Sequence, residues 1–127
     1  MAGRRVARLG EQLRREITDI LRREAKDPRI GDVIITDVEV TRDLAYARVY
    51  VQVPGDEAAR AQTLEGLRAA APFVRTELGR RLHIRRVPEL RFLLDTTLER
   101  ALRIERLLRE IRSEGGSGAT GEGGPDA

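Results

Sequence analysis

The fold of this chain is decided by the stretch LEGLRAAAPFVRTELGRRLHIRRVPELRF, residues 64–92. Its apolar residues recur at spacings of three and four and so predict one apolar stripe along a helix: Leu64, Leu67, Ala71, Val74, Leu78 and Leu82. Pro72 interrupts this helix, because proline has no backbone N–H and its ring crowds the carbonyl four positions earlier. We therefore predict two short helices that meet at Ala70, Ala71 and Pro72, then a basic segment and, after Pro88, a strand.

Upstream of this stretch, residues 4–25 place their apolar side chains on one face of another predicted helix, which Pro28 ends. The pattern then changes to period two over residues 32–41 and again over residues 45–53. These two segments predict strands that are joined by the short connection at Arg42–Leu44. We therefore expect an antiparallel hairpin with one face toward the core.

The open face of this hairpin is predicted to carry Tyr46, Arg48 and Tyr50. Aromatic side chains on an open sheet can stack the bases of single-stranded RNA. Tyrosine is also simply a residue that favours strands. The pattern leaves both explanations open.

Downstream of Pro88, residues 90–94 alternate again and predict a third strand. A last helix follows, with capping-box spacing between Thr96 and Glu99. The remaining residues are almost wholly Gly, Ser, Ala, Thr, Glu and Asp, and they cannot bury enough apolar area to offset their ordering entropy. We predict one domain over residues 1–112 and a disordered tail over residues 113–127.

The composition excludes several kinds of chemistry. The chain has no cysteine and a single histidine, His83, which excludes disulfides, thiolate nucleophiles and cysteine metal sites. It has no Gly-rich phosphate loop of the Walker type and no HExxH motif. We expect no enzymatic activity, no cofactor and no metal. No apolar run reaches signal-peptide length or the roughly 20 residues of a membrane span, so we expect a cytoplasmic protein without membrane contact.

The basic residues matter through their placement, because 24 Lys and Arg against 21 Asp and Glu leave a net charge of only +3. We predict contacts with nucleic-acid backbone, which the resemblance given below narrows to RNA, at the kink, in the basic segment after it and at the beginning of the first helix: Arg4, Arg5, Arg8, Arg68, Ala70, Ala71, Pro72, Arg75, Arg80, Arg81, Arg85 and Arg86. Structural explanations also stay open. A helix C-terminus favours cations such as Arg80 and Arg81, and the arginines of the first turn could form a frayed, solvated terminus.

The predicted order of elements is helix, strand, strand, helix, kink, helix, strand and a last helix. This α+β order resembles the type II KH domain, an RNA-binding fold, although the chain lacks the GXXG loop with which ordinary KH domains clamp nucleic-acid backbone. Four blocks also resemble the bacterial ribosome-binding factor A family: VARLGEQLRREITDILRREAKDPRI, VEVTRDLAYARVYV, FVRTELGRRLHIRRVPELRF and LERALRIERLL. That family has Ala-x-Gly at the kink. Here it falls on Ala70, Ala71 and Pro72, so proline replaces the glycine and removes an amide donor.

The resemblance implies a single type II KH-like domain with an additional C-terminal helix. It implies a non-enzymatic assembly factor that binds the small (30S) ribosomal subunit and its precursors, contacts 16S rRNA, and assists late subunit maturation, including processing of the 16S rRNA 5′ end. It also implies importance for growth in the cold, and we expect a monomer when the protein is free. The alternative is a protein-interaction module on the same scaffold, because amphipathic helices and open strand edges also receive protein partners.

Overall fold

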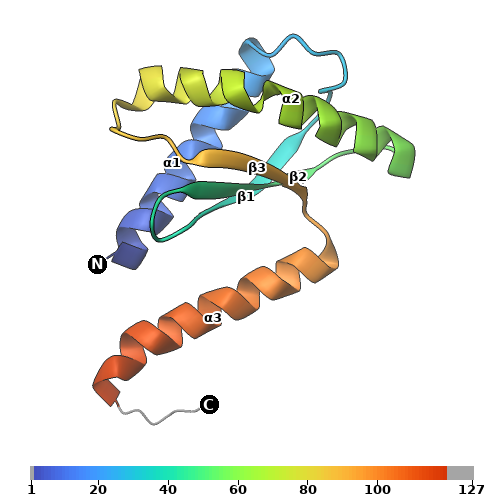
Figure 1. The fold of residues 1–127 in the computed structure, drawn as a ribbon. Coiled ribbons are helices and arrows are strands. Elements are labelled where there is room, and N and C mark those ends of the chain that lie inside the picture. The colour runs from blue at the N-terminus through green and yellow to red at the C-terminus, as the bar shows by residue number, and fades with distance from the viewer. Residues whose placement is uncertain (1, 120–127) are drawn as a thin grey trace. The chain divides into compact units, whose positions relative to one another are not determined.

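The computed structural model describes residues 2–119, with side chains over residues 5–113. The chain divides into two compact units, of which the first ends at Leu94 and the second begins at Asp95. The elements follow the predicted order (Figure 1): α1 (Ala2–Arg23), β1 (Ile34–Val40), β2 (Tyr46–Gln52), α2 (Glu57–Leu82), β3 (Glu89–Leu94) and α3 (Thr97–Ala119).

The first unit is built on a three-stranded sheet in the order β1-β2-β3, with β2 in the centre. β1 pairs antiparallel with β2, which confirms the predicted hairpin, and β3 pairs parallel with β2. Val49 stands at the middle of the sheet, where its Cα lies opposite Val38 on one side and Phe92 on the other. Because successive strand residues point to opposite faces, Ala47, Val49 and Val51 all face the core.

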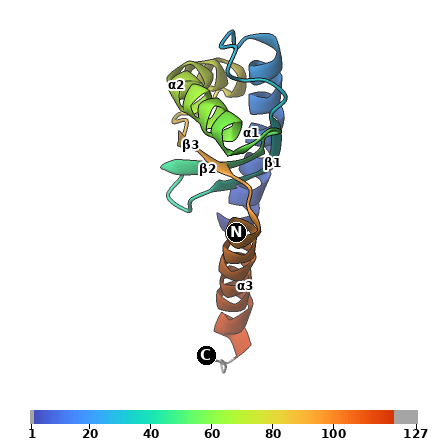
Figure 2. The same cartoon turned by 90° about the vertical axis from the view of Figure 1, so that its right-hand side faces the viewer.

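Two helices cover this apolar face of the sheet. α1 lies against β1 and α2 against β3, and the two helices also contact each other (Figure 2). Their fully buried side chains join those of the strands in one core cluster: Leu13, Ile17, Ile20, Val49, Val51, Leu67, Val74 and Leu78. The spacings of three and four between apolar residues thus predicted the buried faces of α1 and α2.

The predicted pair of short helices around Pro72 is wrong, because α2 is one helix of 26 residues with this proline inside it. Leu67 before the proline and Val74 and Leu78 after it are all fully buried, so side-chain packing holds both halves against the sheet. This packing offsets the roughly 3 kcal/mol that an interior proline costs. The ribbon does change direction near the middle of α2 (Figure 1).

The ends of α2 are fixed by local signals. The Asp56 carboxylate accepts a hydrogen bond of 2.9 Å from the Ala59 N–H and caps the first turn. The helix ends at His83, which adopts the left-handed conformation with φ of 53°. The left-handed residue turns the chain out of α2 toward β3.

The second unit consists of α3 and the residues before it. The Glu99 N–H donates a hydrogen bond of 3.1 Å to the Thr96 hydroxyl, which is one of the two bonds of the predicted capping box. The Asp95 carboxylate lies 3.3 Å from both Arg100 and Arg103. α3 extends to Ala119, and residues 120–127 lie outside the described part of the chain. The predicted domain boundary at residue 112 and the predicted disordered tail after it stay predictions. Between residues 2 and 119, no helix has the length and apolar character needed to cross a bilayer.

Candidate nucleic-acid interface

Arg81, one of the predicted RNA-binding residues, is surrounded by carboxylates. Its guanidinium lies 2.9 Å from Glu16, 2.8 Å from Asp19 and 2.7 Å from Glu24. These hydrogen bonds raise the pKa of Arg81 above its ordinary value, and the bond to Asp19 contributes most. The same bond is the main reason that the pKa of Asp19 is lowered. The acidic partners balance the charge of Arg81, which connects α2 to α1.

Arg75 and Arg68 both reach from α2 toward β3 and the loop before it. Arg75 donates two hydrogen bonds to the Val87 carbonyl, from Nε at 3.0 Å and from Nη2 at 2.8 Å. Arg68 Nη2 donates one of 3.3 Å to the Phe92 carbonyl. Arg75 thus holds the loop and Arg68 holds β3. A carbonyl does not neutralise a guanidinium, so both side chains keep their charge on the β3 side of α2.

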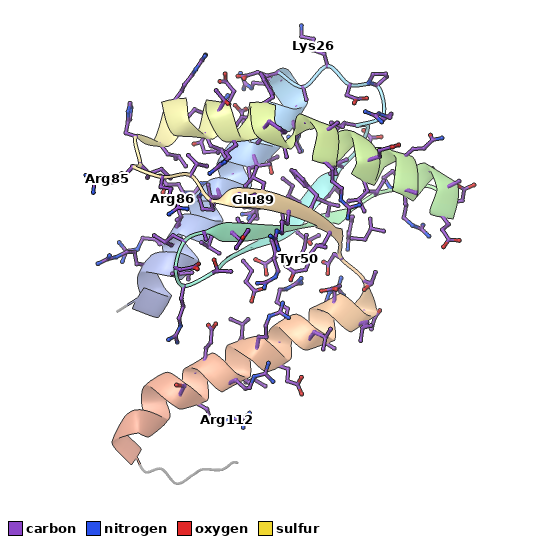
Figure 3. All side chains as sticks on the ribbon, viewed as in Figure 1. Lys26, Tyr50, Arg85, Arg86, Glu89 and Arg112 are labelled. Carbon is purple, nitrogen blue, oxygen red and sulfur yellow. The ribbon has the colours of Figure 1, made fainter. Side chains whose placement is uncertain are left out.

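The loop between α2 and β3 exposes Arg85 and Arg86, which Figure 3 labels between the end of α2 and Glu89. This loop adjoins the turn between β1 and β2, where the Glu89 N–H donates a hydrogen bond of 2.9 Å to the Ala45 carbonyl. The pKa of Asp43 in that turn is lowered, first by a hydrogen bond from Thr41 and to a smaller degree by the charge of Arg86. The two segments meet at the hairpin end of the sheet.

The beginning of α1 lies at the same end of the first unit (Figure 1). Gly10 allows α1 to approach β1 closely, because an added Cβ would come within 2.6 Å of the Val38 carbonyl oxygen. Arg5 and Arg8 are exposed in this part of α1. The side chain of Arg4 lies outside the described residues. We call the set Arg5, Arg8, Arg85 and Arg86 the basic end.

The basic end is the part of the predicted site whose charges stay available. Between residues 5 and 113, no side chain or backbone group accepts a hydrogen bond from these four guanidiniums, and no carboxylate forms an ion pair with them. Arg80, by contrast, lies 3.3 Å from Glu77, although 74% of its side chain is exposed. Guanidiniums without partners in the chain, on two segments that are distant in sequence, can bind phosphates.

The predicted kink residues lie elsewhere on the first unit. Pro72 is exposed, while Ala70 and Ala71 are half-buried. Pro72 precedes the end of α2 by ten residues, which is about 15 Å along a helix. The structure therefore places the arginines of the basic end at one end of the first unit, away from the middle of α2.

A shallow groove of about 300 Å³ lies beside the middle of α2, on the side that faces the loop after α1. The groove is lined by Glu24, Ala25, Lys26, Asp27, Ala69, Ala70 and Phe73. Of these residues only Ala70 was predicted to contact RNA. The sequence did hold a signal for Phe73: a large aromatic residue falls outside the apolar stripe of Leu67, Val74 and Leu78, and 43% of it is exposed.

The tyrosines of the sheet are engaged in other contacts. The Arg91 guanidinium lies 3.9 Å from the centre of the Tyr46 ring and covers one of its faces. Tyr50 is fully buried, and its hydroxyl donates a hydrogen bond of 3.3 Å to Glu39. These contacts favour the structural explanation of both tyrosines over base stacking.

Known proteins resemble the chain over most of its length. The family model for ribosome-binding factor A matches residues 5–108. The ribosome-binding factor A of Heliobacterium modesticaldum is 51% identical over 113 residues, which cover 89% of this chain and 93% of that protein. The solution structure of a Thermotoga maritima protein, described as a putative ribosome binding factor A, is 33% identical with a TM-score of 0.66 and covers 73% of this chain and 89% of that one.

A third relative has been placed on a ribosomal particle. It is a homology model of the Thermus thermophilus ribosome binding factor A, fitted into a cryo-EM map of a complex between the 30S subunit and that protein. It is 30% identical to this chain, has a TM-score of 0.57 and covers 69% of this chain and 92% of the other. The match of the family model and the identity with its members lead to one conclusion: the chain belongs to the ribosome-binding factor A family.

Proposed function

We propose that this protein binds the small ribosomal subunit and its precursors and assists late maturation of the subunit, including processing at the 5′ end of 16S rRNA. It does so by binding, without catalysing a reaction, as a monomer in the cytoplasm. Membership of the family supports the proposal, and so does the relative that was fitted into a map of a 30S complex.

The basic end carries the proposal on this chain, because its four guanidiniums are exposed and unpaired. Exposed arginines can each donate two parallel hydrogen bonds to a phosphate, and they stay charged at any physiological pH. The remaining predicted residues, Arg68, Arg75, Arg80 and the stretch 70–72, would add contacts along α2. Arg81 contributes through the fold, since its charge is balanced by Glu16, Asp19 and Glu24.

Binding of this kind acts on rRNA maturation through selection of a conformation. A ligand shifts a conformational equilibrium only by the difference in its affinity for the two states. A protein that contacts phosphates at fixed spacing binds the rRNA arrangement that presents them at that spacing. The basic end would thus hold one arrangement of the maturing rRNA and exclude others.

The test is co-sedimentation with precursor small subunits, mature small subunits and large subunits over a salt series. If four phosphates are neutralised, affinity should fall roughly 50- to 150-fold between 50 and 200 mM salt. The double substitution Arg85→Glu and Arg86→Glu should abolish most of the binding and flatten the salt dependence. Circular dichroism should show an unchanged fold, because both side chains are exposed.

A matched control reverses two exposed arginines of the second unit, Arg109→Glu and Arg112→Glu, with the same change in net charge. This control should bind as the parent protein does. Equal loss of binding in both variants would show that net charge, and not the position of the arginines, determines binding. If the Arg85 and Arg86 variant still binds small subunits, the basic end is not the RNA-binding site. That result would favour the protein-interaction alternative.

A further inference from the structure

We propose that the groove beside the middle of α2 binds an unpaired nucleobase of the RNA, stacked on Phe73, with Lys26 at a neighbouring phosphate. This inference rests on the proposed function and gives the groove a ligand class. The groove lies on the α1 side of α2, whereas Arg68 and Arg75 reach toward β3 on the other side. It is thus a contact separate from both those arginines and the basic end.

The loop that forms the outer wall of the groove is fixed against α2. Arg29 lies 2.7 Å from Asp27 within the loop and 3.5 Å from Glu65 on α2. The Arg29 side chain crosses α2 at Gly66, where an added Cβ would come within 3.0 Å of it. The wall therefore exists before any ligand binds, and little ordering entropy is lost on binding.

One lysine stands at the rim of the groove, where a phosphate next to a bound base would lie. Both carboxylates in the lining contact an arginine, Glu24 lying 2.7 Å from Arg81 and Asp27 lying 2.7 Å from Arg29. Both arginines are shared with further carboxylates. Lys26 is exposed and projects outward from the loop (Figure 3). Within residues 5–113 no carboxylate forms an ion pair with Lys26, so its ammonium can reach a phosphate next to the groove.

The floor of the groove favours a flat, apolar ring. Ala69 and Ala70 have no atoms beyond Cβ, so a planar group can approach the helix closely beside the exposed ring of Phe73. The volume of about 300 Å³ is at the lower end of the range for small-molecule sites and suits a single base. Every base presents a π face, so stacking on one aromatic residue tolerates any sequence.

The test uses the absence of tryptophan from the chain. The substitution Phe73→Trp introduces one indole at the groove, and a base stacked on it should quench its fluorescence. The probes are a single-stranded octaribonucleotide and an abasic ribose-phosphate octamer with the same number of phosphates. The octaribonucleotide should quench the indole and the abasic octamer should not.

The matched control is Ala61→Trp, at another exposed position of α2, twelve residues or about 18 Å from position 73 along the helix. Its fluorescence should not respond to either octamer. Equal quenching at positions 61 and 73, or equal quenching by the abasic strand, would overturn the proposal. Quenching at position 73 by rRNA-free small-subunit proteins, without quenching by RNA, would also overturn it and assign the groove to a protein.

A second measurement separates this inference from the proposed function. Phe73→Leu keeps an apolar side chain and removes the aromatic face, so its affinity for small subunits should fall about 5- to 150-fold if one base stacks there. If the parent protein binds small subunits and Phe73→Leu binds equally well, the groove proposal fails and the function stands. If the octaribonucleotide quenches the indole but the parent protein does not select small subunits, the function fails and the groove stands.

Discussion

Arg81 Nη2, near the end of α2, lies 2.7 Å from Glu24 Oε2, just beyond the end of α1. The same guanidinium also contacts Glu16 and Asp19, so one side chain bridges three positions along α1. Arg81 is only 24% exposed, which makes these contacts less screened than ordinary surface pairs. The junction of the two helices depends on this side chain.

We predict that Arg81→Met lowers the midpoint of thermal unfolding by several degrees, because it leaves Glu16 and Glu24 without this cation and Asp19 with only the exposed Arg23. Differential scanning calorimetry at low salt measures the effect. Arg80→Met is the control, since its one ion pair with Glu77 is highly exposed and should contribute little. Similar midpoints for the two variants would contradict the role assigned to Arg81.

The contribution of Asp19 to stability should depend on pH. Its pKa is lowered in the folded state, chiefly by the hydrogen bond from Arg81, so this contribution is complete above the unfolded pKa of about 3.9 and is lost as pH falls through the folded value. The difference in unfolding free energy between the parent protein and Arg81→Met should therefore shrink below about pH 4. Urea unfolding from pH 7 to pH 2.5 tests it; a difference independent of pH would count against the prediction.

Two helical glycines should respond oppositely to alanine. Gly10→Ala would place Cβ 2.6 Å from the Val38 carbonyl oxygen, so we expect a loss of about 1–3 kcal/mol as α1 is pushed from β1. Gly79→Ala would meet Val87 at 3.6 Å, an ordinary contact, and should gain up to about 1 kcal/mol of helix stability. Urea unfolding measures both. A gain at position 10 would show that α1 can move away from β1 at little cost.

Pro72→Ala restores the missing N–H within α2, and Pro72 is exposed, so no core contact is lost. We predict a stability gain of up to about 3 kcal/mol. Denaturant unfolding gives the value, and the amide of residue 72 should become protected from hydrogen exchange. A loss of stability would mean that burial of Leu67 and Val74 on either side requires the change of direction in this helix.

Much of the first unit could be predicted because its patterns are local. Alternation over residues 32–41 and 45–53 identified β1 and β2, and spacings of three and four identified the buried faces of α1 and α2. The continuity of α2 could not be predicted from local spacing. Burial of Leu67, Val74 and Leu78 against the sheet offsets the cost of Pro72, and the position of the sheet depends on residues far away in the sequence.

The candidate site was less predictable for the same reason. Arg81 and Arg85 look alike in sequence, yet the partners of Arg81 lie 57 to 65 positions away on another helix. The gathering of Arg5 and Arg8 with Arg85 and Arg86 depends on which end of the sheet each segment reaches. Lys26 and Phe73 share a groove only because the loop after α1 packs on α2.

The parallel pairing of β2 with β3 has a consequence for synthesis of the chain. It joins Tyr46 to Glu89, 43 positions later, whereas the hairpin closes between Thr41 and Tyr46. Local contacts form before distant ones, so the hairpin precedes the docking of β3. At 5–20 residues per second, the ribosome needs roughly 2 to 9 s to make the intervening segment. During that time the nascent chain exposes an unpaired edge of β2, which a chaperone or a neighbouring chain can reach.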